Sequence, residues 1–117
     1  MKKYDPRALA SVDDFLHLDV RVGTIVSAEP LAGARKPALA LRIHFGELGT
    51  RVSTAQITDL YESQELVGLQ VVAIVNFPSK RVAGIDSEVL VLAADNGHGE
   101  NAILIPERPV PDGAKVS

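Results

Sequence analysis

Residues 18–25 read LDVRVGTI, and this stretch indicates the fold class. Up to Val22 its apolar residues alternate with polar ones, which is the period of a β-strand with one face against a core. After Gly23 the apolar phase slips, and the next apolar side chain is that of Ile25. A phase slip at a glycine predicts a β-bulge or a sharp bend, as in a long strand that serves two sides of a barrel.

Two further strands follow from the same kind of pattern. Residues 39–45 read LALRIHF, in which large apolar side chains alternate with Ala, Arg and His. This alternation predicts a second strand with one solvated face. The sequence GELG at 46–49 then predicts a hairpin turn into a third strand near 51–55.

The runs at 71–75 and 89–92 are apolar at every position, which predicts strands that are covered on both faces. In a chain this short, we expect the second cover to come from the terminal segments or from a second subunit. A turn at 96–99 leads to a last short strand at 102–105, and the prolines after it predict an extended tail.

Two short helices are expected between these strands. Ser11 is followed by two aspartates, as in a helix that begins with a serine N-cap and acids in its first turn, and this helix is expected to carry Phe15 and Leu16 onto the core. The apolar residues at 57–61 have helical spacing, and Gly68 lies where such a helix would end.

Three strands, a helix and two further strands are the element order of an OB-fold, a small barrel that binds oligonucleotides and other ligands. We therefore predict an all-β chain with a five-stranded OB barrel and one helix between strands three and four. Residues 1–117 are expected to form one domain, with short terminal extensions at 1–13 and 106–117. Another small barrel or a sandwich is the main alternative.

Composition excludes several kinds of site. The chain has no cysteine, so disulfides, thiolate metal sites and cysteine nucleophiles are excluded. His17, His44 and His98 lack metal-ligand spacing and are interpreted as surface residues. Neither a GxSxG elbow nor a glycine-rich phosphate loop is present. We therefore expect a protein that is not an enzyme and holds no metal or other cofactor.

The bulk properties also set expectations about location and partners. No apolar run approaches the roughly 20 residues of a membrane span, so we expect no membrane insertion, and a domain without disulfides suits the cytoplasm. The net charge of −3 is low for a nucleic-acid binder. If the chain binds RNA, it therefore needs a local basic patch.

The most informative polar segment is NFPSKRVAGIDSE at 76–88, between the two most apolar runs. Its cations are suited to phosphates, its aromatic ring to stacking on a base, and its amide and carboxylate to base edges. Basic residues at 35–36 lie in the loop between the first two strands, which flanks the same face of an OB-fold. A solvated hairpin loop and scattered surface charges are the alternatives. The candidate residues are Arg35, Lys36, Arg42, Lys80 and Arg81 for phosphates, and Asn76, Phe77, Ser87 and Glu88 for peptides or bases.

Several of these stretches, in this order, resemble the EMAP-type tRNA-binding domain. They are FLHLDVRVGTI at 15–25, RKPA at 35–38, STAQI at 53–57, LVGLQVVAIVNFP at 66–78 and GIDSEVLVL at 84–92. The NFP and SEVL forms are similar to the stand-alone CsaA branch of this family, an export-related chaperone. The resemblance extends from about Asp13 to the end of the chain.

The resemblance implies a homodimer, with tRNA binding as the property of the domain. For the CsaA branch it further implies a protein-export chaperone, which binds unfolded or precursor polypeptides and cooperates with a SecA-type export ATPase. A tRNA-binding protein without a chaperone role is the alternative function. Neither implication requires a cofactor.

Overall fold

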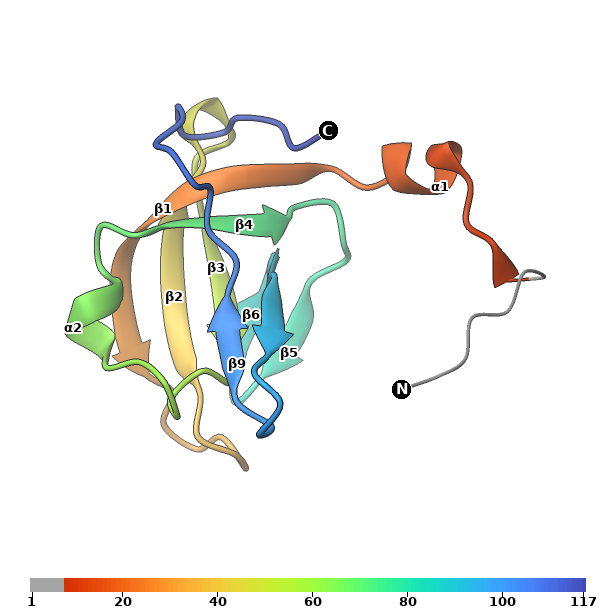
Figure 1. Ribbon diagram of the computed structural model, residues 1–117. Helices are drawn as coiled ribbons and strands as arrows, with labels where there is room; N and C mark the ends of the chain where they lie inside the picture. Colours follow the sequence, from red (N-terminus) through yellow and green to blue (C-terminus); the bar gives the residue numbers. More distant parts are fainter. Residues whose placement is uncertain (1–7) are drawn as a thin grey trace.

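The computed structural model describes residues 8–117, and its central element is the long strand β1, Val20–Pro30 (Figure 1). The first half of β1 pairs with β4, Gln70–Ile74, and its second half pairs with β2, Leu39–His44. Strand β3, Thr50–Ala55, pairs with β2, and the short strand β7, Leu90–Val91, pairs with β4. All four pairings are antiparallel and give the order β3-β2-β1-β4-β7. The predicted all-β, OB-like barrel is therefore confirmed.

The β-bulge in β1 lies later than the sequence indicated. Ile25 pairs with Ile43, but Ser27 pairs with Arg42, so Val26 is the extra residue. Gly23 instead allows a close approach between strands. A Cβ atom at this position would lie 2.7 Å from both Ile43 Cγ2 and Phe45 Cδ1. The glycine therefore marks tight packing at the bend, and the register changes three residues later.

Helix α1, Val12–Leu16, begins as predicted, but it does not join the core. The Asp14 N–H donates to Ser11 Oγ at 3.2 Å, and the Ser11 N–H donates to Asp14 Oδ2 at 2.8 Å. Phe15 and Leu16 are nevertheless 40% and 58% exposed, because α1 extends away from the barrel (Figure 1). The expectation that these two residues pack onto the core is therefore wrong for the described chain. A cap is a local signal and carries no information about where the helix lies.

The second helix lies between β3 and β4, as expected, but it is shorter than the pattern indicated. It is α2, Ser63–Leu66, and residues 57–61 form a separate turn in which the Tyr61 N–H donates to the Ile57 carbonyl at 3.3 Å. Ile57 and Leu66 are both buried. The apolar spacing therefore comes from two successive turns, residues 57–61 and α2, which pack against the same core. Gly68 follows α2 with a φ of 91°, a conformation that favours glycine.

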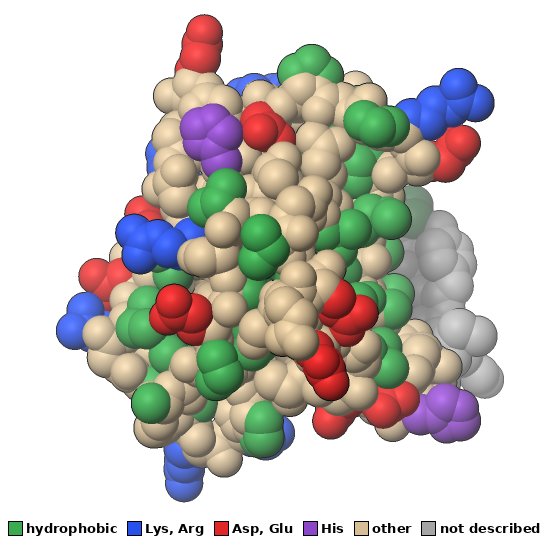
Figure 2. All heavy atoms as spheres, turned by 90° about the vertical axis from the view of Figure 1, so that its left-hand side faces the viewer, with side chains coloured by type: hydrophobic (Ala, Val, Ile, Leu, Met, Phe, Trp, Pro, Cys, Tyr) green, Lys and Arg blue, Asp and Glu red, His purple; other side chains and the backbone are tan. Residues whose placement is uncertain are grey.

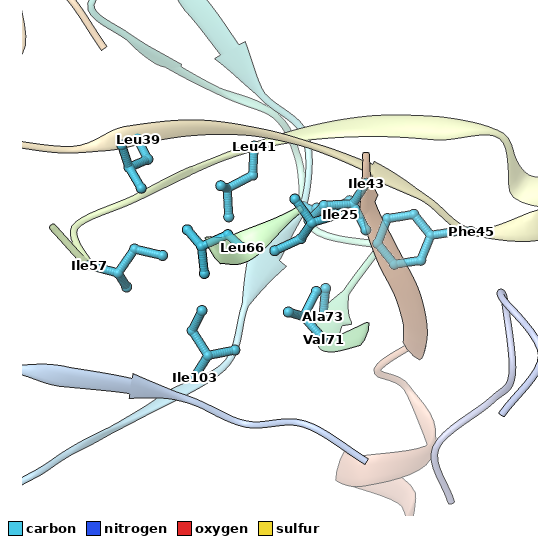
Figure 3. Packing of buried hydrophobic residues seen from close by; sticks show 11 residues of the cluster. Ile25, Leu39, Leu41, Ile43, Phe45, Ile57, Leu66, Val71, Ala73 and Ile103 are labelled. Atoms are coloured by element: carbon cyan, nitrogen blue, oxygen red, sulfur yellow. The ribbon is translucent and has the colours of Figure 1, made fainter. Parts of the chain in front are cut away.

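The core is formed by the inward side chains of the barrel strands together with α2 (Figure 3). It includes the predicted inward residues of β2 and, just after that strand, Phe45. Val71 and Ala73 of β4 are fully buried. The cluster comprises Ile25, Leu39, Leu41, Ile43, Phe45, Ile57, Leu66, Val71, Ala73, Val89 and Ile103.

The run at 89–92 is not covered on both faces in the described chain. Val89 is buried, but Leu90 is 46% exposed. The last predicted strand is also shorter than expected: β9, Asn101–Ile103, pairs with β8, Ala93–Asp95, and leaves Leu104 and Ile105 exposed. The pattern at 89–92 therefore overstated the length and the burial of its strand, and the pattern at 102–105 overstated the length of its strand.

The tail after residue 106 is extended, as its prolines indicated, and it lies along β1. The Gly113 N–H donates to the Val22 carbonyl at 2.7 Å, and the Val22 N–H donates to the Ala114 carbonyl at 2.9 Å. The Val116 N–H continues the pairing with the Val20 carbonyl at 2.8 Å. The tail passes close to the short 3₁₀ helix η2, Gly46–Leu48 (Figure 1). It thus supplies a backbone partner to the half of β1 that β2 does not reach.

Candidate ligand cavity

The segment at 76–88 forms a hairpin that lies over the edge of the barrel. Its strands are β5, Lys80–Val82, and β6, Ile85–Ser87, and Ala83 and Gly84 between them both have positive φ. The hairpin, the β1–β2 loop and the outer face of β3 line a cavity of about 780 Å³ that is open to solvent. The two loops that the sequence selected are therefore neighbours in space.

Ser87 and Glu88 fasten the hairpin to the edge of β3. The Thr54 N–H donates to Ser87 Oγ at 3.0 Å, and the Val52 N–H donates to Glu88 Oε1 at 3.1 Å. The Glu88 N–H in turn donates to the Val52 carbonyl at 2.7 Å. Both side chains also line the cavity, so a role in ligand binding would be added to this structural one.

Four of the five predicted phosphate-binding residues gather around the cavity. Arg35 and Lys36 come from the β1–β2 loop, and Lys80 and Arg81 come from β5; all four line the cavity. Arg81 is partly neutralised by Asp86 across the hairpin, at 3.0 Å. In a chain with a net charge of −3, this is a local concentration of positive charge.

Arg42 does not join the other four cations. It is exposed on β2, where it pairs with Val52 in the register of β2 and β3, and it does not line the cavity. Its side chain shares the outer face of the sheet with that of Val52, because paired residues on neighbouring strands point to the same side. A contact with phosphate would therefore require a ligand that extends beyond the cavity.

The walls of the cavity between these cations are largely apolar. They include Phe77, Pro78, Val82, Val89 and Leu90. Phe77 is 42% exposed and also lines a second, more polar hollow of about 470 Å³, together with Arg51, Asp86 and Glu88. The ring therefore stands between two recesses and is accessible to a ligand from either.

Asn76 does not line the cavity, although it precedes Phe77 in the chain. Its Oδ1 accepts from the Asp19 N–H at 2.8 Å, and its Nδ2 donates to the His17 carbonyl at 2.8 Å. These bonds fix the segment between α1 and β1 to the end of β4. These two bonds use one of the two acceptor sites and one of the two donors of the amide, so Asn76 has an anchoring role, and its role in base recognition stays a prediction.

Sequence reasoning missed Thr54 and Gln56, which line the cavity on the β3 side. Their position in the sequence indicated only the end of a strand. What brings them into the site is the docking of the hairpin on β3, which depends on the path of the chain. Two signals reached this region of the surface: the matching of the two loops through the OB-fold, and the resemblance at 53–57, which assigned these residues no role.

The face over α2 carries side chains of both charges (Figure 2). On the face over α2, basic side chains are scattered near the outline, among acidic and apolar ones (Figure 2). Within residues 8–117, no three His, Cys, Asp or Glu side chains are grouped as ligands for a metal ion. None of the helices described is long and apolar enough to cross a bilayer.

Residues 20–115 match the family model described as "Putative tRNA binding domain", which spans β1, the barrel, the cavity and most of the tail. The chain belongs to this tRNA-binding domain family. Members of the family also occur as parts of longer proteins. The methionine–tRNA ligase of Bacteroides fragilis is 39% identical over 110 residues, which are 94% of this chain and 16% of the ligase. The chain therefore spans about one sixth of the length of that curated relative.

Two solved structures match this chain over their whole length. The chaperone CsaA from Bacillus anthracis is 51% identical, with a TM-score of 0.89, and the match covers 94% of this chain and all of that one. The CsaA chaperone protein from Picrophilus torridus is 41% identical, with a TM-score of 0.87, covering 93% and all of that chain. The predicted resemblance to CsaA is thus confirmed, and these comparisons point to a binding module.

Proposed function

We propose that this chain is a CsaA-like protein-export chaperone that binds unfolded or precursor polypeptides in the cavity under the β5–β6 hairpin. One observation carries the proposal: an open cavity of about 780 Å³ combines apolar walls with four cations at its rim. The full-length similarity to two CsaA chaperones supports it. We further propose a binding role without catalysis.

The apolar walls are the feature that favours a polypeptide. Unfolded chains expose apolar side chains, and burying such surface stabilises a complex by about 25 cal/mol per Å². Phe77 is exposed, aromatic and part of the cavity wall, so it is the best single anchor for an apolar side chain. A site for phosphates alone would not need this wall.

The cationic rim favours a second ligand, tRNA. Lys and Arg side chains hold RNA mainly through its phosphates, and such binding weakens steeply as salt rises. The family model supports this ligand, so a tRNA-binding protein without a chaperone role is the second candidate function. We propose that both ligands use Arg35, Lys36, Lys80 and Arg81, which makes their binding competitive.

We also propose a homodimer in the cytoplasm that cooperates with a SecA-type export ATPase. The extended N-terminal segment supports the dimer, because Leu9, Val12, Phe15 and Leu16 are all exposed on it. Apolar side chains that gather on a projecting segment are typical of an interface. The ATPase and the compartment rest on the resemblance to the CsaA branch. Sedimentation would test the dimer, and co-purification would test the ATPase.

The proposed function is tested by titrating labelled bulk tRNA and a labelled unfolded polypeptide at two salt concentrations. Lys80→Ala with Arg81→Ala should weaken tRNA binding at low salt and flatten its salt dependence. Phe77→Ala should weaken polypeptide binding at both salt concentrations, because the phenyl ring binds through apolar contacts, which salt does not screen.

Arg108→Ala provides the matched control, because Arg108 is an exposed cation that does not line the cavity. It should leave both affinities unchanged. Polypeptide binding that persists at high salt and depends on Phe77 supports the chaperone. Salt-sensitive tRNA binding without any polypeptide binding would contradict it and leave the tRNA-binding candidate.

A further inference from the structure

Strand β3 is one of the two edge strands of the five-stranded sheet. The β5–β6 hairpin covers only part of the edge of β3 that faces away from β2. In residues 8–117, the backbone bonds that this part of the chain gives to β3 both reach the Val52 carbonyl, from the N–H groups of Glu88 and Val89. Beyond Val52 the contact is made by a side chain, Ser87 Oγ on the Thr54 N–H. The hairpin therefore diverges from β3 just where the cavity begins.

The backbone of Thr54 is oriented towards the cavity. In an antiparallel pair, the N–H and C=O of one residue point to the same side of the strand. Because the Thr54 N–H donates to Ser87 and not to β2, its carbonyl also points away from β2. Thr54 and Gln56 line the cavity, so the end of the β3 edge forms part of its wall. The Gln56 carbonyl already accepts from Asn101 Nδ2 at 3.5 Å, so the Thr54 carbonyl is the acceptor that this edge offers.

An extended polypeptide can bind both to the strand edge and to the pockets of this wall. Its backbone N–H groups donate hydrogen bonds to the free carbonyls of a strand edge. Its alternate side chains enter the pockets on either side. An unstructured chain carries such donors at almost every residue, which suits a site that must bind many sequences. The edge supplies sequence-independent affinity, and the pockets supply the preference.

The charges around the cavity determine that preference. Arg35, Lys36 and Lys80 lie at the rim, and Arg81 shares its charge with Asp86. The carboxylate of Glu88 also lies in the cavity, but its Oε1 accepts from the Val52 N–H. The net charge around the cavity is therefore positive. A bound polypeptide with carboxylate side chains is favoured over one with ammonium groups.

We infer that this cavity takes a polypeptide as an added β-strand along the end of β3 at Thr54 and the turn after it at Gln56, and that it prefers segments in which acidic and apolar residues alternate. This inference rests on the proposed function and names the ligand class for the same site. An alternating segment presents its apolar side chains on one face and its carboxylates on the other. Apolar walls and a cationic rim are complementary to these two faces.

The added strand is tested with a synthetic peptide of about ten residues in which glutamate and valine alternate, long enough to span the edge at roughly 3.3 Å per residue. A series of peptides carries one backbone N-methyl group each, at successive positions. Only every second N–H of an added strand points to its neighbour, so N-methylation should weaken binding by about tenfold at alternate positions. Intervening positions should change affinity little.

The outcomes distinguish this inference from the proposed function. If the peptide binds and N-methylation has no period-two effect, the added strand is overturned while the chaperone proposal stands. If the peptide does not bind but an unfolded polypeptide does, only the inference is overturned. If neither binds while bulk tRNA still does, both are overturned. A period-two loss supports the inference.

The charge preference needs a separate pair of variants. Lys36→Glu should reduce affinity for the glutamate peptide and raise it for a peptide with lysine in place of glutamate. Lys115→Glu makes the same change of charge on the tail, outside the cavity, and should leave the ratio of the two affinities near that of the parent. Equal effects of the two variants would show that net charge, and not the rim, sets the preference.

Discussion

Ser53 of β3 is the one buried polar side chain among the described residues with no hydrogen-bond partner for its oxygen. It is 1% exposed, so its hydroxyl has been removed from water without a replacement. Ser53→Ala removes this group and keeps most of the volume. We expect the free energy of unfolding to rise by about 1 kcal/mol in urea titrations.

Ser79→Ala is the matched control, since Ser79 is exposed and lies before β5. It should change the free energy of unfolding by less than about 0.5 kcal/mol. A loss of stability on Ser53→Ala would contradict this prediction, because it would mean that the hydroxyl makes a stabilising contact.

Asn76 provides a second test at the residue scale. Its amide bonds to the backbone at His17 and Asp19, so Asn76→Ala should release the segment between α1 and β1. Hydrogen exchange at the Asp19 amide should become about fivefold faster, as expected when a bond that stabilises by about 1 kcal/mol is removed. Asn96→Ala, in the β8–β9 turn, should leave exchange at Asp19 unchanged.

The same variant separates anchoring from ligand recognition. If Asn76→Ala lowered affinity for tRNA without altering exchange at Asp19, the side chain would have the base-binding role that the sequence suggested. Faster exchange with little change in affinity is the result that anchoring predicts.

At the scale of elements, the C-terminal tail is the segment whose contribution is easiest to test. Asp112 Oδ1 accepts from Thr24 Oγ1 at 2.6 Å, and the Val110 carbonyl accepts from Gln70 Nε2 at 2.7 Å. Removal of residues 110–117 would break these bonds and the backbone pairing with β1. We expect the free energy of unfolding to fall by at least about 2 kcal/mol, measured in urea.

The single change Asp112→Ala should cost less than the deletion, because the backbone pairing remains. Lys115→Ala alters a side chain in the same tail that makes no ion pair among the described residues, and it should cost under about 0.5 kcal/mol. A truncated chain as stable as the parent would mean that the tail lies on the barrel without supporting it.

The elements also show how far a sequence can predict this molecule. Strands such as β2 were predictable because a period of two reports which face is buried. The lengths of α2 and β7, and the exposure of Phe15, were not, because they depend on which segments meet. Lys80 and Arg81 were selected from a polar segment between two apolar runs, and the OB-fold then linked Arg35 and Lys36 to them. Thr54 was missed because hairpin docking leaves no local pattern.

At the scale of the whole molecule, the central feature is a cavity that combines positively charged and apolar side chains. The chain has a net charge of −3, yet its cavity has a cationic rim, apolar walls and a partly open strand edge. These features together suit an extended, acidic and apolar chain better than they suit a duplex. The proposed function therefore depends on the ligand entering this cavity.

Amide hydrogen exchange of the protein, with and without a bound unfolded polypeptide, tests this claim most directly. We expect slower exchange at residues 33–38, 54–56 and 77–90, which include the lining of the cavity, and no change in the β8–β9 turn. Protection confined to other segments, for example the exposed residues 104–105, would contradict the assignment of the site.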